Sequence, residues 1–184
     1  MVVLQCPSLE ILPQFVAALE GGWSPNNIRP EARLEQLEHI RKDPAEFIAS
    51  LDDKEARGAP VKMKDVSTVP RLPGFNRWIW DGAFSGLVSF RWQKGSNALP
   101  DHCLGHIGFN IVPEKRRRGY ATKALALLLP EARAQGLGYV ELTTDLDNIG
   151  SQKVITANGG QLHETFIATA SNGGAEMLRY RIKL

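Results

Sequence analysis

The composition of an anion-binding turn is found in six consecutive residues, Arg116-Arg117-Arg118-Gly119-Tyr120-Ala121. A strand-like run at 106–112 precedes them, and a helix-like run at 121–129 follows. Where a strand leads into a helix in this way, the first backbone N–H groups of the helix have no helical partner and, with the helix dipole behind them, attract anions. Gly119 leaves space for such an anion, and the run of cations from Lys115 to Arg118 strengthens the positive potential. The sequence therefore predicts a site for a phosphorylated ligand, in particular a diphosphate.

The common nucleotide-binding motifs do not fit this segment. The P-loop requires a second glycine followed by lysine and then serine or threonine, and the chain contains no such sequence. The chain also has no Gly-x-Gly-x-x-Gly after an early strand, which argues against a dinucleotide-binding fold. The turn therefore belongs to another class of phosphate-binding site.

Two segments carry a resemblance to a known family. The pattern Arg-x-x-Gly-x-Ala at 116–121, after a strand that ends in Val112-Pro113, resembles the coenzyme A signature Gln/Arg-x-x-Gly-x-Gly/Ala of the GNAT superfamily of N-acetyltransferases. Residues 148–160 are similar to the pattern Asn-x-x-Ala/Ser-x-x-Leu/Val-Tyr-x-x-x-Gly-Phe, which in that superfamily forms the helix beside the pantetheine arm. Asn148 suits the N-cap of this helix, and Gly159 suits its left-handed end.

The two motifs stand in the family's order and at its distance. A β-branched run at 139–144 lies between them, so the unit reads strand, phosphate turn, helix, strand, helix over 105–165, roughly a third of the chain. The resemblance implies an α/β fold with a mixed, mostly antiparallel central sheet and flanking helices.

The resemblance further implies that acetyl-CoA is the acyl donor and that an amine attacks its thioester directly in a ternary complex. Backbone donors on the strand before the turn would polarise the thioester carbonyl and stabilise the oxyanion. The residues implied to bind the coenzyme are Asn110, Ile111, Val112, Arg116, Arg117, Arg118, Gly119, Tyr120, Ala121, Thr122, Asn148 and Ser151.

One departure from the family pattern concerns the general acid. Many GNAT enzymes have a tyrosine in the second motif that protonates the departing thiolate, and the matching residue here is Ile155, which has no proton to give. Tyr180, on the expected last strand, could reach inward, although an aromatic residue there is more often part of the core or the surface. The acid is therefore unassigned, with water, Tyr180 and another side chain as alternatives.

A base is needed because an amine with an ordinary pKa of about 10.4 arrives protonated at neutral pH. In some members of the superfamily a carboxylate on the strand before the phosphate turn takes this proton, and His106 is the nearest match to that position. Histidine titrates in the right range, but it could equally be hydrogen-bonded within the sheet. Glu141 and Asp145, on or just after the next strand, are the other candidate bases, and Asp145 also suits a turn before the helix at Asn148.

The two cysteines, Cys6 and Cys103, carry no clear chemical signal. The chain has no basic, apolar signal peptide and no apolar run near 18 residues, so we expect a soluble, cytoplasmic protein with reduced thiols. Residues 101–106 include metal-like ligand types, but a zinc site needs a further ligand, and no Cys-x-x-Cys is present. We expect no metal site, and a nucleophilic Cys103 is an alternative to a loop cysteine without a role.

The elements that position these residues fit a single domain over 1–184. The chain is 43% hydrophobic and 23% charged, with a net charge of +2, which is globular composition and too mild a charge for a general nucleic-acid binder. We expect a helical N-terminal part and loop at 1–74, a core sheet with the coenzyme motifs at 75–167, and a terminal hairpin at 161–184.

Hydrophobic periodicity and turn residues predict the individual elements. The N-terminal part should contain a strand at 2–5, helices at about 12–19, 34–40 and 44–51, and a long loop at 52–74. The core should contain strands at 75–80 and 84–92 around Asp81-Gly82. The terminal hairpin should pair 161–167 with 176–183.

Three local details can be checked directly against a structure. Asp43 should cap the third helix. The side chains of Phe84, Val88, Phe90 and Trp92 should alternate onto one face of their strand. Pro130 should bend the helix after the phosphate turn without dividing it.

Two other functions stay open. One is a coenzyme A-binding module without transferase activity, which Ile155 favours. The other is a nucleic-acid binder that uses Lys115 to Arg118, which the lack of interleaved aromatic residues disfavours. For the transferase, the acceptor is a small-molecule or peptide amine in a pocket shaped by 12–51 and the loops near Trp23, Trp78 and 95–103. No nucleic-acid or membrane partner is expected, and a homodimer stays open.

Overall fold

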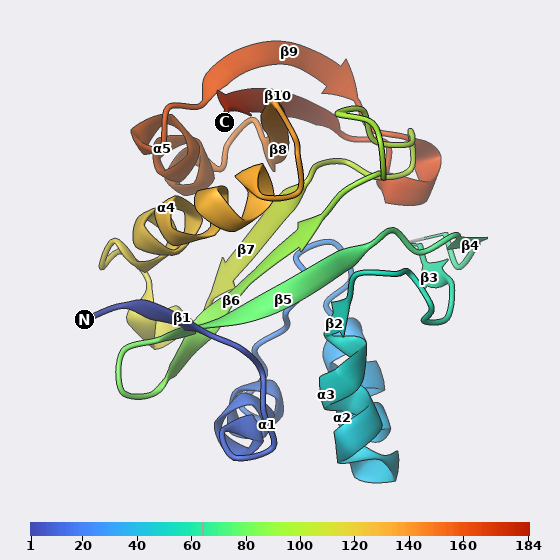
Figure 1. The fold of residues 1–184 in the computed structure, drawn as a ribbon, viewed down its shortest axis with the longest axis vertical. Helices are drawn as coiled ribbons and strands as arrows, with labels where there is room; N and C mark the ends of the chain where they lie inside the picture. The colour runs from blue at the N-terminus through green and yellow to red at the C-terminus, as the bar shows by residue number, and fades with distance from the viewer. Residues whose placement is uncertain (64) are drawn as a thin grey trace.

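A central antiparallel sheet lies in the middle of the molecule (Figure 1). The computed structural model describes residues 1–63 and 65–184. Its central sheet has the strand order β1-β5-β6-β7, and β2 also pairs with β5. The strands are β1 (Val3–Gln5), β2 (Asp52–Asp53), β5 (Gly74–Trp80), β6 (Phe84–Arg91) and β7 (Ile107–Ile111).

A second antiparallel sheet follows in the order β8-β10-β9, and a two-residue ribbon pairs β3 with β4. These strands are β8 (Tyr139–Asp145), β9 (Gln161–Ile167), β10 (Glu176–Lys183), β3 (Val61–Lys62) and β4 (Thr68–Val69). The expected hairpins β5–β6 and β9–β10 are both confirmed.

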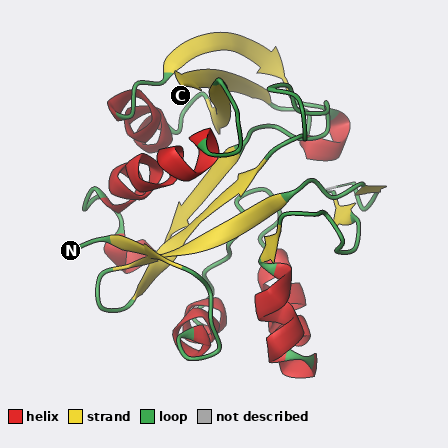
Figure 2. Cartoon of the chain, in the orientation of Figure 1, coloured by secondary structure: helices red, strands yellow, loops and turns green. Residues whose placement is uncertain are grey.

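The helices cover the central sheet from two sides (Figures 1 and 2). Helices α4 and α5 lie on one side, and α1, α2 and α3 lie on the other. Their bounds are α1 (Leu12–Glu20), α2 (Ala32–Lys42), α3 (Pro44–Ser50), α4 (Tyr120–Arg133) and α5 (Ile149–Ala157), with short 3₁₀ turns at Pro113–Lys115 and Ala170–Asn172.

The chain's local signals explain where these helices begin and end. Asp43 caps α3 by accepting hydrogen bonds from the backbone N–H groups of Ala45 and Glu46, as expected. Asn148 caps α5, and Gly159, with φ +82°, follows its end. Helix α4 continues through Pro130 as one helix, which confirms that the proline does not divide it.

Each face of the central sheet has its own hydrophobic core. On the α4 side, Val88 and Phe90 of β6 pack in a core with Leu125 and Leu128 of α4. This core, which we call the main core, extends to β8 and β10 of the second sheet. The other core joins α1, α2 and α3 to the opposite face of the sheet, and it contains Leu12, Phe15, Leu19, Trp23, Leu37, Ile40, Phe47, Trp78, Phe84, Leu87 and Val112.

The two sheets meet where β7 and β8 begin to separate. The backbone N–H of His106 donates to the carbonyl of Glu141 over 2.7 Å, and the N–H of Glu141 donates to Nδ1 of His106 over 3.0 Å. Within residues 1–63 and 65–184, β7 and β8 share no ladder of strand pairs beyond this junction. The diverging strands therefore leave a split between the sheets, and α4 connects its two sides.

Two sequence expectations need correction. Residues 52–74 were expected to form a loop, but they contain β2, β3 and β4, because short backbone pairings form there without a hydrophobic pattern. Phe84 was expected on the face of Val88, yet it packs in the opposite core. A register shift opposite Ile79 and Trp80 places an extra β6 residue in the ladder and reverses the alternation at Phe84.

Candidate functional site

The backbone of the phosphate turn is bent by two left-handed residues. Arg117 has φ +59° and Gly119 has φ +78°, and α4 begins at the next residue, Tyr120. A Cβ atom added to Gly119 would meet nothing within 4 Å, so open space lies beside it. A non-glycine residue such as Arg117 in this conformation stores strain, and strain of this kind concentrates where a backbone is shaped for a ligand.

This turn leaves a row of backbone donors free. Among the residues that the structure describes, the backbone N–H groups from Arg117 to Thr122 donate no hydrogen bond. The first N–H of this segment with a partner is that of Lys123, which donates to the carbonyl of Gly119 over 3.0 Å. The row stands at the N-terminus of α4, where the helix dipole favours an anion.

Side chains around the turn hold its shape. Lys115 and Tyr120 both donate to Oδ2 of Asp81, over 2.7 and 2.6 Å, and Arg116 Nε donates to the carbonyl of Ile111 over 3.0 Å. The hydrogen bonds from Lys115 and then Tyr120 hold the pKa of the Asp81 carboxyl well below its usual range. Lys115 is therefore neutralised by an ion pair. The sequence predicts only a hairpin position for Asp81 and gives no sign of its contacts with the phosphate turn.

A cavity of about 1240 Å³ opens at this turn and continues through the split between β7 and β8. It reaches the other face of the central sheet, where the segment before α2 covers it. The predicted coenzyme-binding residues that line it are Asn110, Ile111, Arg116, Arg117, Gly119, Tyr120, Ala121, Thr122, Asn148 and Ser151. The structure therefore brings most of the predicted set together around one hollow.

Two residues of that set lie outside the cavity lining. Val112 is buried in the core on the α1 side, and its backbone N–H donates to the carbonyl of Ser85 over 3.1 Å. Arg118 is exposed and is not part of the cavity lining. The alternation of an antiparallel ladder instead places the backbone N–H groups of Phe109 and Ile111 on the edge of β7 that faces β8.

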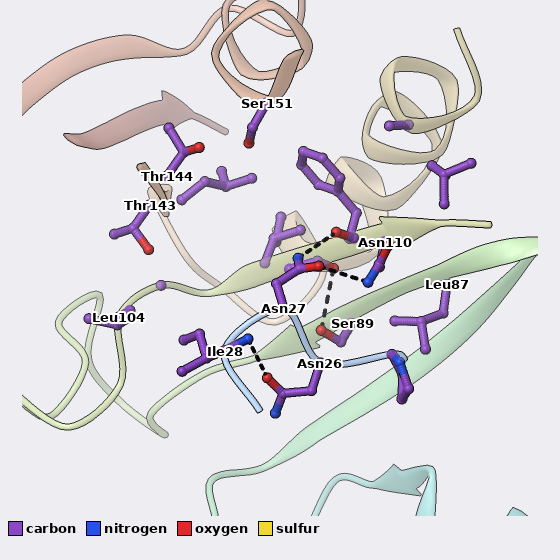
Figure 3. Close-up of a pocket in the computed structure, with 18 of the residues that line it drawn as sticks. Asn26, Asn27, Ile28, Leu87, Ser89, Leu104, Asn110, Thr143, Thr144 and Ser151 are labelled. Atoms are coloured by element: carbon purple, nitrogen blue, oxygen red, sulfur yellow. Dashed lines mark hydrogen bonds between the residues drawn. The ribbon is translucent and has the colours of Figure 1, made fainter. Parts of the chain in front are cut away.

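The second motif contributes the start of α5. The Asn148 side chain accepts a hydrogen bond from the Ser151 N–H over 3.0 Å, so it is used as the helix cap. Ser151 and Val154 line the cavity, whereas Ile155 is fully buried in the main core. Figure 3 shows Ser151 and Thr144 on one side of the cavity and Asn27, Asn110 and Ser89 on the other.

Asn110 binds protein groups with its side chain. Its Nδ2 donates to the carbonyl of Ser24 and to Oδ1 of Asn27, each over 2.7 Å, and its Oδ1 accepts from Nε1 of Trp23 over 3.3 Å. These bonds tie the segment before α2 to β7 at the edge of the cavity (Figure 3). Trp78 lines the cavity, and the expectation that Trp23 and Trp78 help to shape an acceptor pocket stays a prediction.

The geometry around His106 does not favour the role of base. Its side chain is 0% exposed, it does not line the cavity, and its Nδ1 accepts the hydrogen bond from Glu141. Burial lowers the pKa of His106 to about 4, so the imidazole is neutral at pH 7 and a poor proton acceptor. This is the alternative of a histidine hydrogen-bonded within the sheet.

Of the other three catalytic candidates, the fold places two away from the cavity and one at its lining. Glu141 is buried and accepts from Nη2 of Arg181 over 2.7 Å, away from the cavity lining. Tyr180 lies in the main core and does not line the cavity either. Asp145, at the exposed end of β8, does line it. Asp145 is thus the candidate that the structure leaves in a position to reach a substrate.

Polar residues that the sequence reasoning missed also line the cavity. Thr144 is 4% exposed, and its hydroxyl has no hydrogen-bond partner among the described residues. Ser89 and Arg91 of β6 reach the cavity from the central sheet. The alternation of β6, with Val88 and Phe90 inward on one face, would have pointed to the intervening polar residues on the other face.

The described residues contain no cluster of three or more histidine, cysteine or acidic side chains that could hold a metal ion. Cys6 and Cys103 are free thiols. In the part of the chain that the structure describes, the search for a helix with the length and apolar character to cross a membrane finds none.

The family model described as acetyltransferase (GNAT) domain matches residues 28–161. No curated protein matches the chain in sequence. Many solved structures share the fold, among them the following three. The Mycobacterium smegmatis RimJ structure with a coenzyme A disulfide has a TM-score of 0.66 and 18% identity, and the match covers 99% of this chain and 81% of that chain.

The other two structures are 14% identical to this chain, and both matches cover 100% of it. RimL, a ribosomal L7/L12 alpha-N-protein acetyltransferase in complex with coenzyme A, has a TM-score of 0.64 with 94% of that chain covered. The microcin C7 self-immunity acetyltransferase MccE, in complex with acetyl-CoA and AMP, has a TM-score of 0.62 with 92% of that chain covered. At these identities the likeness demonstrates the fold.

Proposed function

Because the chain belongs to the GNAT acetyltransferase family, we propose that it transfers the acetyl group of acetyl-CoA to an amine by direct attack. In this reaction the amine nitrogen forms a bond to the thioester carbonyl carbon, the carbon–sulfur bond breaks, and the sulfur leaves as a thiolate. The observation that carries the proposal is the row of free N–H groups from Arg117 to Thr122, which opens into the cavity between β7 and β8.

The residues of the turn fit a diphosphate. Their backbone donors, the N-terminus of α4 and the nearby guanidinium groups of Arg116 and Arg117 together favour an anion of high charge. The open space beside Gly119 leaves room for it. From there the split between the sheets is lined by the edge of β7 and by Ser151, which suits an extended arm with amide groups.

On the β7 side, backbone donors would act on the reacting carbonyl. The N–H groups of Phe109 and Ile111 point from the strand edge toward the split, and their positions are held by the β6–β7 ladder. Donors that are fixed before the reaction stabilise developing negative charge without a cost of reorganisation. We assign the oxyanion to this edge.

In the proposed reaction, one protein side chain takes part in the proton transfers, as the base, and no side chain acts as the acid. Asp145 lines the cavity, and we propose it as the base, directly or through water. Thr144 offers a hydroxyl that has no partner among residues 1–63 and 65–184, and we propose that it hydrogen-bonds the substrate within the split. Water protonates the thiolate in this scheme, since Ile155 and Tyr180 are both buried in the core.

The function is tested with acetyl-CoA and a panel of amines that includes small molecules and peptides, with detection of the released thiol. We expect amine-dependent thiol release from at least one acceptor class and an acetylated amine as the product. Asp145→Asn should lower turnover by roughly 100-fold, the lower range of general base contributions, with coenzyme A affinity unchanged.

A second function, a coenzyme A-binding module without catalysis, is favoured by one observation. No tyrosine hydroxyl outside the Asp81 contact lines the cavity among the described residues, so the family's usual acid is missing. Coenzyme A binding by calorimetry, together with no thiol release from any amine in the panel, would establish this function in place of the transferase.

A further inference from the structure

Beyond β7, the cavity contains a polar row on the sheet face that α1, α2 and α3 cover. Asn76 of β5 lies opposite Ser89 of β6, and Ser89 lies opposite Gly108 of β7. Arg91 is two residues further along β6 and therefore on the same face. These residues all line the cavity. They are separated from the phosphate turn, which lies at the other end of β7.

The guanidinium of Arg91 lies over Gly108. Its Nη2 donates to the hydroxyl of Ser89 over 3.0 Å, and that hydroxyl donates to the carbonyl of Gly108 over 3.3 Å. A Cβ atom added to Gly108 would lie 3.2 Å from Nη2 of Arg91 and 3.3 Å from the Ser89 hydroxyl. The absence of a side chain at Gly108 therefore gives the guanidinium its space above the strand.

The basic side chains near Arg91 form ion pairs with carboxylates. Arg29 pairs with Glu35 over 2.5 Å, and Lys62 reaches the same carboxylate over 3.4 Å. Arg71 lies 3.9 Å from Asp53. Arg91 has no carboxylate within ion-pair distance anywhere in residues 1–63 and 65–184.

The hydrogen-bonding capacity of Arg91 is also largely unused. A guanidinium has five N–H donors in a planar fork, and the described structure gives one of them an acceptor, the Ser89 hydroxyl. A half-buried cation with no counter-ion and with most of its donors unpaired is well suited to bind an anionic ligand that supplies the missing acceptors. Carboxylate and phosphate groups match the fork geometry with two parallel hydrogen bonds.

The space around Arg91 suits a substrate that extends past it. A side cavity of about 330 Å³ shares Asn76, Ser89 and Arg91 with the main cavity and continues toward Phe75 and Leu72. The split that would hold the thioester lies on the other edge of β7, one strand width or about 5 Å from the Gly108 row. A small acceptor can span that distance.

We propose that Arg91, oriented by its hydrogen bond to Ser89 and assisted by Asn76, binds an anionic group of the acceptor, so that the preferred substrates are amines that also carry a carboxylate or a phosphate. This inference rests on the proposed acetyl transfer to an amine. It names the substrate class that the acceptor half of the cavity selects, and it makes Arg91 a residue that determines specificity.

The test compares matched acceptors that differ in one anionic group. An α-amino acid is compared with its amide, a tripeptide with a free carboxyl terminus with the amidated peptide, and O-phosphoethanolamine with ethanolamine. In the parent enzyme the anionic member of at least one pair should have the higher kcat/KM. The pair with the larger ratio distinguishes carboxylate from phosphate.

Arg91→Gln should then raise the KM for the anionic acceptor by roughly 10- to 100-fold, the loss expected for hydrogen bonds to a charged group. The neutral acceptor and coenzyme A should change by less than about 2-fold. Arg91→Lys keeps the charge without the fork and should give an intermediate KM. Lys62→Gln, which removes a cation that is already paired with Glu35, should leave the anionic preference intact.

Equal kcat/KM for both members of every pair in the parent, or an equal effect of Arg91→Gln on both members, would overturn the inference while leaving acetyl transfer established. Failure of every amine to release thiol would instead overturn the proposed function. If Arg91→Gln does not fold, Gly108→Ala places a methyl group against the guanidinium, and the same selective rise in KM is expected.

Discussion

Single residues contribute to this site through the groups that they leave unpaired. Gly119 allows a turn in which the backbone N–H groups of the helix start remain free. In the part of the chain that the structure describes, Thr144 has a buried hydroxyl without a partner, and Arg91 has a guanidinium without a counter-ion. Buried polar groups are nearly always satisfied in folded proteins, so exceptions that line a cavity indicate a ligand.

Gly119→Val should weaken coenzyme A binding by roughly 10- to 100-fold, measured by calorimetric titration. A β-branched residue at φ +78° costs on the order of 1–3 kcal/mol, and the backbone relieves this strain by abandoning the turn. Gly136→Val is the matched control, because Gly136 has φ +82°, has equally open surroundings and lies after the far end of α4. Equal affinity in the parent and in folded Gly119→Val would remove the turn from the binding site.

Thr144→Val should lower kcat/KM for acetyl transfer by about 10-fold, the contribution of one hydrogen bond. Because no described residue hydrogen-bonds this hydroxyl, its replacement by a methyl group should leave the free energy of unfolding unchanged or raise it by up to about 1 kcal/mol. Thr144→Ser keeps the hydroxyl and should keep most of the activity. If Thr144→Val turns over like the parent, the hydroxyl has no role in the split.

At the scale of secondary-structure elements, His106 connects the start of β7 to β8 at the point where the two strands separate. It joins the start of β7 to β8 through one hydrogen bond from its backbone and one to its ring. Beyond this link the strands diverge and the cavity begins. A neutral imidazole buried at the junction of two sheets holds them in one geometry, a positioning role distinct from the base that the sequence suggested.

The pKa of His106 predicts how stability depends on pH. The unfolded chain binds a proton at this residue at about pH 6.5, while burial keeps the folded pKa at about 4. The contribution of neutral His106 to the free energy of unfolding is therefore fully present above about pH 6.5. It is lost as the pH falls toward 4, and the total loss is on the order of 3 kcal/mol. Urea unfolding of the parent across this range should show the loss.

His106→Gln is the control, because glutamine can still accept from the Glu141 N–H but does not titrate. The difference in unfolding free energy between the parent and the variant should be constant above about pH 7 and should change between pH 6.5 and 4. Turnover at pH 7 should stay within a few-fold of the parent. A roughly 100-fold loss of turnover with unchanged coenzyme A affinity would restore His106 as the base.

Across the whole molecule, the main core joins both sheets into one unit. It contains Val88 and Phe90 from the central sheet, Leu128 from α4, and Val140 and Ile182 from the second sheet. A core shared in this way supports the prediction of a single domain. Since the central sheet also forms one side of the opposite core, we expect the chain to unfold in one cooperative step, as small single domains usually do.

Leu128→Ala should lower the free energy of unfolding by about 2–5 kcal/mol, because Leu128 is fully buried in this core. Far-UV circular dichroism and tryptophan fluorescence should give coincident curves that shift together, since Trp92 lies in the main core and Trp23 and Trp78 lie in the opposite core. Leu127→Ala is the control, as the neighbouring Leu127 is 37% exposed. Two separated transitions would show that the sheets unfold independently.

The sequence alone determined the parts that depend on local interactions. The cap at Asp43, the cap at Asn148 and the left-handed Gly119 are set by residues within a few positions, so their types and spacing are sufficient to predict them. Most of the coenzyme-binding residues predicted from the sequence likewise line the cavity, because the strand, turn and helix that carry most of them are consecutive in the chain.

The tertiary structure decided the roles that depend on distant partners. Burial of His106 against β8 and packing of Tyr180 in the core follow from how the two sheets meet, and no local pattern encodes that contact. Asp81 became the support of the phosphate turn because it lies 34 positions from Lys115 in sequence and 2.7 Å away in space. Arg29, Lys62 and Arg71 each lie near a carboxylate, whereas Arg91 has none within ion-pair distance in the described structure. Only the folded chain determines which charges meet.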